Sequence, residues 1–220
     1  MQLLIKLLDR PEIKYPMLPE SEKQHAFLTP DETIRFLNAF QHAPSFRISY
    51  FGLMTGLRPK ELTYLEWKDI DIEMKTAKIT SKPPDFVIKD KQERTVQLNK
   101  AAMSILKEIL ADKPDNKYVF VYREKPIKSI RRSVDTAAKR ADIKKKMTPN
   151  MLRHTFATHA IMKGADLKSV QALLGDVYIT ATQKYIHAVE EQLKKTVKLL
   201  EDINDKVPTF KAKNKGSRKP

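Results

Sequence analysis

Cysteine is absent from this 220-residue chain, and its absence excludes disulfide bonds, thiolate nucleophiles and cysteine-based zinc sites. Glycine is scarce, with 5 residues, and the sequence has no glycine-rich phosphate-binding loop. No segment approaches the ~18–20 consecutive apolar residues of a membrane span. The N-terminal segment MQLLIKLLDR is short and lacks the small-residue cleavage site of a signal peptide. We therefore expect an intracellular, cytoplasmic protein with no membrane partner.

Basic residues, by contrast, are abundant. Lys and Arg number 42 against 27 Asp and Glu, which gives a net charge of +15. Such an excess favours a nucleic-acid partner, or less often an anionic membrane surface, although a solvated basic surface has the same composition. Hydrophobic residues make up 41% of the chain and charged residues 31%, which is typical of a globular protein.

The periodicity of apolar residues predicts a mainly α protein with a small antiparallel β-sheet, that is, an α+β fold. Three prolines within residues 1–28 predict an irregular lead-in strap or linker. Residues 29–205 form the predicted domain, and residues 206–220 a basic tail that stays disordered until it meets a polyanion. Helices are predicted over approximately residues 29–42, 46–54, 100–110, 127–141, from 148 onward, and over 188–204. Thr55-Gly56 is a helix C-terminal signal that ends the second of these, and Pro59 starts another short helix directly afterwards.

The first predicted helix has a clear start signal. Thr29 and Glu32 have the spacing of a capping box, in which each side chain satisfies a backbone N–H of the other residue. We expect Ile34, Leu37 and Phe40 to form its buried stripe.

Alternating and short apolar runs between residues 67 and 98 predict about three strands. The candidate segments are residues 70–73, 77–80, 86–88 and 95–98. In the first of them Asp69, Asp71 and Glu73 share one face, and three carboxylates could in principle hold Mg²⁺. A solvated face is the favoured interpretation, and no metal site is predicted.

The stretch from residue 148 to 185 carries the strongest functional signal. Thr148-Pro149 predicts a helix start, and Asn150, Arg153 and His154 then share one helix face. A Leu-Leu-Gly sequence at 173–175 and Tyr185 follow. An arginine and a tyrosine placed this way in a strongly basic chain suggest phosphate chemistry on a nucleic acid.

Four strings, taken in order, resemble the signatures of the tyrosine recombinases, or phage integrase family. The resemblance covers roughly residues 29–200. Each string alone is a weak signal, whereas the ordered set is strong. The strings are TGLRPKEL (55–62), FVIKDKQERTVQL (86–98), LRHTFATH (152–159), and LLG (173–175) followed by Thr182 and Tyr185.

The resemblance implies the fold of a tyrosine-recombinase catalytic domain and a DNA strand-transfer reaction. A tyrosine hydroxyl attacks a phosphodiester, giving a 3′-phosphotyrosyl enzyme and a free 5′-hydroxyl, and a second 5′-hydroxyl then reverses the step. The resemblance implies no metal, ATP or other cofactor. It implies double-stranded DNA as partner and a homo-oligomer, a tetramer, on that DNA. Such enzymes integrate or excise mobile elements or resolve chromosome dimers.

By the same resemblance, Arg58 and Arg153 form the clamp on the reacting phosphate. Guanidinium groups bind the non-bridging oxygens bidentately, where charge accumulates in the transition state. The structural alternatives are an Arg58 that pairs with Glu61 or Asp69, and an Arg153 in an ion pair.

Tyr185 is the implied nucleophile, and Tyr178 is its nearest rival in the sequence. A phenol is almost fully protonated at neutral pH, so it needs cationic neighbours to lose its proton. Lys89 matches the lysine that protonates the leaving 5′-oxygen, and Lys91 would point to the same face of a strand. A solvated turn lysine is the alternative for both.

Two positions depart from the family pattern. Asn150 stands where the family usually has His or Lys, and Asp176 where it usually has His or Trp. Asn150 can donate hydrogen bonds to a phosphate but cannot carry a proton, and an ionised Asp176 only accepts hydrogen bonds. His154 either braces its helix or takes over one of these roles. These departures favour the alternative hypothesis of a weakened or inactive relative that binds recombination sites. A third hypothesis is a DNA-relaxing enzyme like the type IB topoisomerases.

Further basic residues are predicted to contact DNA phosphates, which gives affinity but no sequence information. Family members also carry a separate N-terminal DNA-clamping domain, which residues 1–28 cannot form. The stripe over residues 189–203 suits docking into a neighbouring protomer or packing on its own domain. The predicted phosphate contacts are Arg131, Arg132, Lys139, Arg140, Lys144, Lys145 and Lys146.

Overall fold

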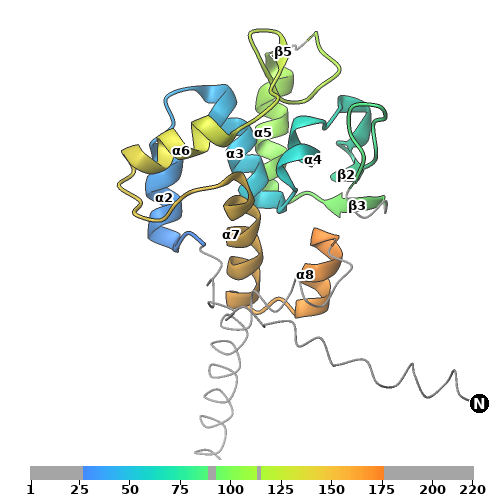
Figure 1. The fold of residues 1–220 in the computed structure, drawn as a ribbon. Helices are drawn as coiled ribbons and strands as arrows, with labels where there is room; N and C mark the ends of the chain where they lie inside the picture. The colour runs from blue at the N-terminus through green and yellow to red at the C-terminus, as the bar shows by residue number, and fades with distance from the viewer. Residues whose placement is uncertain (1–26, 89–92, 113–114, 176–220) are drawn as a thin grey trace, which may run out of the picture.

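Helix α7 (Pro149–Met162) stands at the centre of the protein, with buried side chains on most of its circumference. The computed structural model describes residues 27–88, 93–112 and 115–175. Helix α3 (Ala43–Thr55) and helix α8 (Leu167–Leu174) both pack against α7 (Figure 1). The other helices are α2 (Pro30–Asn38), α4 (Pro59–Thr63), η1 (Trp67–Asp69, a 3-10 helix), α5 (Lys100–Ala111) and α6 (Arg131–Arg140).

The capping box at the start of α2 is confirmed. Thr29 Oγ1 accepts from the Glu32 amide at 3.2 Å, and the Thr29 amide donates to Glu32 Oε2 at 2.8 Å. The predicted buried stripe was partly right, because Leu37 and Phe40 are half-buried and pack against the core. Ile34, however, is 59% exposed, and the fully buried residue of the helix is Phe36. The face of α2 that meets α6 is thus rotated from the predicted one, and the helix ends at Asn38 rather than near residue 42.

The predicted three-stranded antiparallel sheet is confirmed, with one strand misassigned. Strands β1 (Ile70–Asp71), β2 (Thr76–Ile79) and β3 (Arg94–Gln97) pair in that order. The expected strand at 86–88 is absent from the described sheet. Phe86 instead pairs with Lys82 across two prolines, which cannot donate to a sheet ladder, so the chain turns back on itself there. A second hairpin, β4 (Val121–Tyr122) and β5 (Lys125–Pro126), was not predicted.

Two hydrophobic clusters support these elements. The main core lies among α3, α4, α5, α6 and the sheet, and includes Phe51, Leu106 and Val134, all fully buried. A much smaller cluster joins α7 to α8, and we call it the satellite core. Its buried members are Ala157, Ile161, Val170 and Leu174.

Chain entry to the domain is anchored on α7. Leu28 is fully buried, and its amide donates to Thr155 Oγ1 at 3.0 Å. The carbonyl oxygen of Leu28 lies 2.8 Å from His159 Nε2. The predictions for residues 1–26, 188–204 and 206–220 lie outside the described residues. Within the described ranges, every helix is too short or too polar to cross a membrane.

Candidate active site

The turn between α3 and α4 brings Arg58 to the site. Gly56 ends α3 in the left-handed region, with φ of 68°. A Cβ there would lie 2.5 Å from a ring carbon of Phe156 on α7 and 2.8 Å from a methyl of Leu174 on α8. Only glycine fits both the backbone angle and this close approach. The turn therefore packs directly on α7 and α8 before α4 begins at Pro59, as predicted.

Glu61 fixes both the backbone and the side chain of Arg58. The Arg58 amide donates to Glu61 Oε2 at 2.8 Å, and Arg58 Nη1 lies 3.2 Å from Glu61 Oε1. The Glu61 side chain is 1% exposed and that of Arg58 is 18% exposed. The predicted Arg58–Glu61 ion pair is thus present in the structure. It is compatible with the clamp, because a buried carboxylate can orient a guanidinium.

Arg153 comes from the second turn of α7 and is buried, with 5% exposure. Its Nη1 donates to the Gly56 carbonyl at 3.0 Å, and its Nη2 donates to the Leu174 carbonyl at 2.8 Å. Arg153 therefore connects the end of α3 to the end of α8.

Arg58 and Arg153 converge at the C-terminal end of α8. Arg58 Nη2 donates to the Gly175 carbonyl at 3.3 Å, next to the Leu174 carbonyl that accepts from Arg153. The last carbonyls of a helix lack intrahelical partners and carry partial negative charge, so they attract cations. The structure thus brings together two arginines that the sequence separates by most of the domain.

Arg94 on β3 is a third arginine at this site, and the sequence analysis missed it. We call Arg58, Arg94 and Arg153, together with Glu61, the arginine cluster. Its Nη1 and Nη2 donate to the two oxygens of Glu61 at 2.9 and 2.7 Å, and its Nε donates to the Leu173 carbonyl at 3.3 Å. The alternation of inward-facing and outward-facing side chains along the strand could have identified it. Arg94 shares a face with the buried Val96, and an arginine that faces inward needs a partner.

Glu61 is the carboxylate that Arg58 and Arg94 share. Burial by itself raises the pKa of Glu61, but the hydrogen bonds and charge of Arg94, and then of Arg58, lower it below the ordinary value of 4.5. Glu61 is therefore ionised at neutral pH. A buried carboxylate with charged partners on both oxygens makes a rigid support.

The remaining predicted catalytic residues divide into two groups. Asn150 is exposed in the first turn of α7, and His154 is half-buried one residue after Arg153. The predictions for Lys89, Lys91, Asp176 and Tyr185 lie outside the described residues.

The predicted phosphate-contacting residues lie mainly on α6. Arg131, Arg132, Lys139 and Arg140 are exposed there, and Lys139 pairs with Asp135 at 2.8 Å.

The lysines after α6 are also engaged within the chain. Lys144 pairs with Asp142 at 2.5 Å. Lys145 lies 2.6 Å from Glu32 and donates to the Phe27 carbonyl at 2.9 Å, which ties this loop to the chain entry. Lys146 is exposed. A phosphate contact by Lys144 or Lys145 would therefore compete with an existing ion pair.

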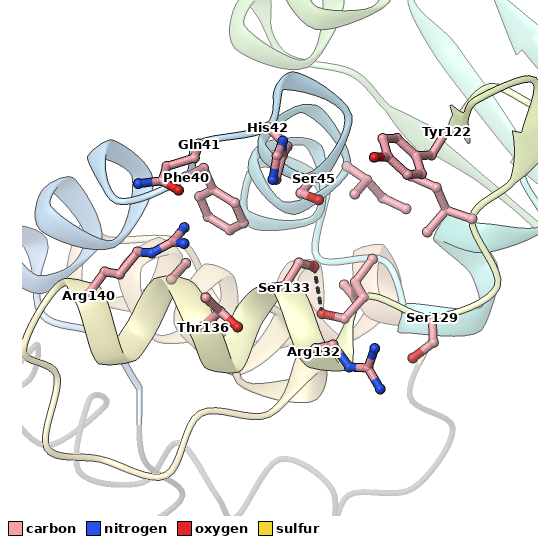
Figure 2. Close-up of a pocket in the computed structure, with 14 residues that line it drawn as sticks. Phe40, Gln41, His42, Ser45, Tyr122, Ser129, Arg132, Ser133, Thr136 and Arg140 are labelled. Carbon is pink, nitrogen blue, oxygen red and sulfur yellow. Dashed lines mark hydrogen bonds between the residues drawn. The ribbon is translucent and has the colours of Figure 1, made fainter.

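A pocket of about 350 Å³ lies between the α2–α3 connection and α6, away from the arginine cluster. Figure 2 shows Arg132, Arg140 and several hydroxyl side chains around it, with Ser133 Oγ donating to the Ile130 carbonyl at 2.9 Å. None of its lining residues belongs to the arginine cluster, so its size does not make it the reaction site.

Two of the three carboxylates considered for metal binding have structural partners. Asp69 accepts from Lys82 at 2.8 Å and from the Glu66 amide at 3.0 Å, and Asp71 accepts from the Met74 amide at 2.8 Å. Among the described residues, no group of three or more His, Asp or Glu side chains is arranged to hold a metal ion.

Residues 26–192 match the phage integrase family. The chain is 34% identical over 154 residues to the tyrosine recombinase XerC of Pelotomaculum thermopropionicum, covering 64% of this chain and 48% of XerC. It is 31% identical over 199 residues to a tyrosine recombinase of Thermosipho africanus, covering 86% and 65% respectively. The chain thus spans about half to two-thirds of the length of the curated relatives that it matches.

Solved structures share the fold. The XerA recombinase superposes with a TM-score of 0.67 at 29% identity, covering 78% of this chain and 65% of XerA. The Tn1549 transposon integrase in complex with transposon right end DNA gives 0.66 at 19% identity, covering 81% and 68%. The catalytic domain of bacteriophage HP1 integrase gives 0.58 at 23% identity, covering 79% and 94%. The predicted fold class, a tyrosine-recombinase catalytic domain, is therefore confirmed.

Proposed function

Because the chain belongs to the phage integrase family, we propose that it is a site-specific DNA recombinase that cleaves and rejoins DNA strands. The Tyr185 hydroxyl attacks a backbone phosphorus and displaces the 5′-oxygen, which leaves as a hydroxyl. A 5′-hydroxyl from a second strand then attacks the phosphotyrosyl bond and releases the tyrosine. One phosphodiester bond is lost and one is gained, so the exchange consumes no ATP.

The convergence of Arg58 and Arg153 is the observation that carries this proposal. Both guanidinium groups donate to adjacent carbonyls at the end of α8, at 3.3 and 2.8 Å. Two guanidinium groups at one place can bind both non-bridging oxygens of a phosphate as its negative charge grows. Loss of one such donor commonly lowers the rate by ~10²–10³.

Lys89 is the proposed general acid for the 5′-oxygen. An ammonium on a flexible stem can approach a leaving oxygen and give up a proton where it is partly desolvated. Lys91 is the second choice for this role.

The proposed partners follow from the reaction. Double-stranded DNA is the substrate, and the exposed arginines of α6 supply cations for its phosphates. Exchange between two duplexes breaks four strands, so a chain with one nucleophile works as a tetramer. The proposed location is the cytoplasm of a prokaryotic cell, or of the host of a virus or mobile element, where such DNA is found.

Asn150 favours a second candidate, a DNA-binding relative without cleavage activity. It is exposed at the start of α7, where the family usually places a residue that can carry a proton. The arginine cluster would then bind a DNA phosphate without cleavage of the phosphodiester bond.

Trapping the covalent intermediate distinguishes the two candidates. The probe is a pool of DNA duplexes that carry a nick and a randomised sequence around it, so that cleavage near the nick releases a short fragment and leaves the protein attached. Denaturing electrophoresis separates attached from unattached protein. We expect an adduct with the wild type and with Tyr178→Phe, and none with Tyr185→Phe.

The other outcomes are equally informative. Tight binding without an adduct in the wild type would favour the DNA-binding candidate. An adduct lost in Tyr178→Phe but retained in Tyr185→Phe would transfer the role of nucleophile to Tyr178. Relaxation of supercoiled plasmid without exchanged products would indicate a topoisomerase-like activity.

A further inference from the structure

Arg94 connects three elements of the arginine cluster. It lies on β3 and donates two parallel hydrogen bonds to the Glu61 carboxylate on α4. It donates a third hydrogen bond to the Leu173 carbonyl at the end of α8. Its side chain is 11% exposed and that of Glu61 is 1% exposed. A two-pronged, largely buried guanidinium–carboxylate pair holds its partners in one geometry.

Arg94 and Arg58 share the same carboxylate. Arg58 uses its amide on Glu61 Oε2 and its Nη1 on Oε1, and Arg94 uses one Nη on each oxygen. Each oxygen of Glu61 thus accepts one hydrogen bond from each arginine. Rotation of the carboxylate would weaken its hydrogen bonds to both arginines at once. The orientation of Arg58 therefore depends on the hydrogen bonds between Arg94 and Glu61.

The shape of the α8 end also matches Arg94. Gly175 has φ of 66°, and a Cβ on it would lie 2.8 Å from Arg94 Cδ and 2.9 Å from Arg94 Nε. The arginine stem therefore lies directly against this glycine. The three successive carbonyls of Leu173, Leu174 and Gly175 accept from Arg94, Arg153 and Arg58 in turn.

We propose that Arg94 is a positioning residue for DNA cleavage, which sets the direction of the Arg58 guanidinium through Glu61 and seats the end of α8 against both clamp arginines. This inference rests on the proposed function of the same site. Arg94 acts through its neighbours and not on the reacting phosphate. A lysine cannot replace it, because one ammonium cannot bind both carboxylate oxygens in a fork.

Arg47 offers a matched control. It binds Glu108 with Nε at 3.0 Å and Nη2 at 2.7 Å, and Asp112 with Nη1 at 2.7 Å, between α3 and α5. Its side chain is 16% exposed, close to the value for Arg94. Its carboxylate partners are more exposed than Glu61, at 52% for Glu108 and 60% for Asp112. Arg47 belongs to neither the arginine cluster nor the predicted DNA contacts, so its variants report the loss of a forked arginine ion pair outside the site.

The first experiment compares Arg94→Gln and Arg94→Lys with Arg47→Gln and Arg47→Lys. Adduct formation on the nicked pool is measured in single turnover below the melting temperature of each variant, together with DNA affinity. We expect both Arg94 variants to slow adduct formation by about 10–100-fold, as outer positioning groups do, with DNA affinity unchanged. An Arg94→Gln rate no lower than that of Arg47→Gln would overturn the proposal.

A pH profile adds a readout that lost stability would not move. The charged groups that hold Glu61 ionised are Arg94 from β3 and Arg58 from α4. Without Arg94, burial raises the pKa of Glu61, so the acid-side fall in the cleavage rate of Arg94→Gln moves to higher pH than in the wild type. An unmoved profile would contradict coupling through Glu61.

A double-mutant cycle between Arg94→Gln and Arg58→Ala separates this proposal from the proposed function. If Arg94 acts by orienting Arg58, Arg94→Gln should lower the cleavage rate little in a protein that already carries Arg58→Ala. Additive effects would overturn the proposal. If the wild type forms no adduct, the proposed recombinase activity fails, and the same cycle measured on the free energy of unfolding still decides whether the two arginines are coupled through Glu61.

Discussion

The main core and the satellite core hold their parts of the molecule in different ways. The main core buries some thirty apolar residues between Leu28 and Leu152, whereas the satellite core buries Ala157, Ile161, Val170 and Leu174. Because apolar stabilisation scales with the area buried, the scaffold is stiff and α8 is weakly held by packing. Hydrogen bonds from three arginines to its last carbonyls supply much of what positions α8.

This difference has a consequence for function. Arg58 and Arg153, the proposed clamp, belong to the stiff part of the molecule, and the carbonyls that they bind lie on the weakly packed part. The direction of the guanidinium groups and the placement of α8 therefore depend on each other. A site of this kind is disturbed more by a small change at α8 than by a comparable change in the main core.

Phe51→Ala is expected to have the largest effect on stability. Phe51 is fully buried on α3 in the main core, and truncation of a buried Phe costs about 3–5 kcal/mol in unfolding free energy. Urea denaturation followed by circular dichroism measures the loss. Ile34→Ala, at a position that is 59% exposed on α2, is the control and should change little. Similar losses in the two variants would contradict this description of the main core.

Val170→Ala is expected to have a smaller but more local effect. Val170 is fully buried in the satellite core, and removal of its two methyl groups costs about 2 kcal/mol at ~0.8 kcal/mol per buried carbon plus a small cavity. Hydrogen exchange should show faster exchange of the α8 amides with little change in α5. Lys168→Ala, on the exposed face of α8, serves as the control. A uniform loss of protection would mean that α8 unfolds only with the whole domain.

Glu61→Gln should lower stability in a way that depends on pH. The pKa of Glu61 is lowered in the folded state, so its ionisation stabilises the protein above the ordinary value of 4.5. That contribution is lost as the pH falls from there through the lowered pKa. The wild type should therefore exceed Glu61→Gln in unfolding free energy near neutral pH and converge with it in acid. Glu73→Gln, an exposed carboxylate on the β1–β2 turn, should show no such convergence.

Local signals predicted the parts of the fold that depend on local hydrogen bonds. The capping box at Thr29, the left-handed end of α3 at Gly56, and the proline starts of α4 and α7 all lie where the sequence predicts them. Each of these depends on residues within a few positions. The burial of Ile34 on α2 and the strand at 86–88 were predicted wrongly because packing partners far along the chain decide both.

The sequence by itself determined the family and identified Arg58 and Arg153 as the proposed clamp, since residue type and order within a motif are written directly in the chain. Only the tertiary structure decided that Arg58 and Arg153 meet at the end of α8, and that Arg94 joins them through Glu61. The physical reason is that a buried charge needs partners, and those partners come from whichever elements the hydrophobic core brings together.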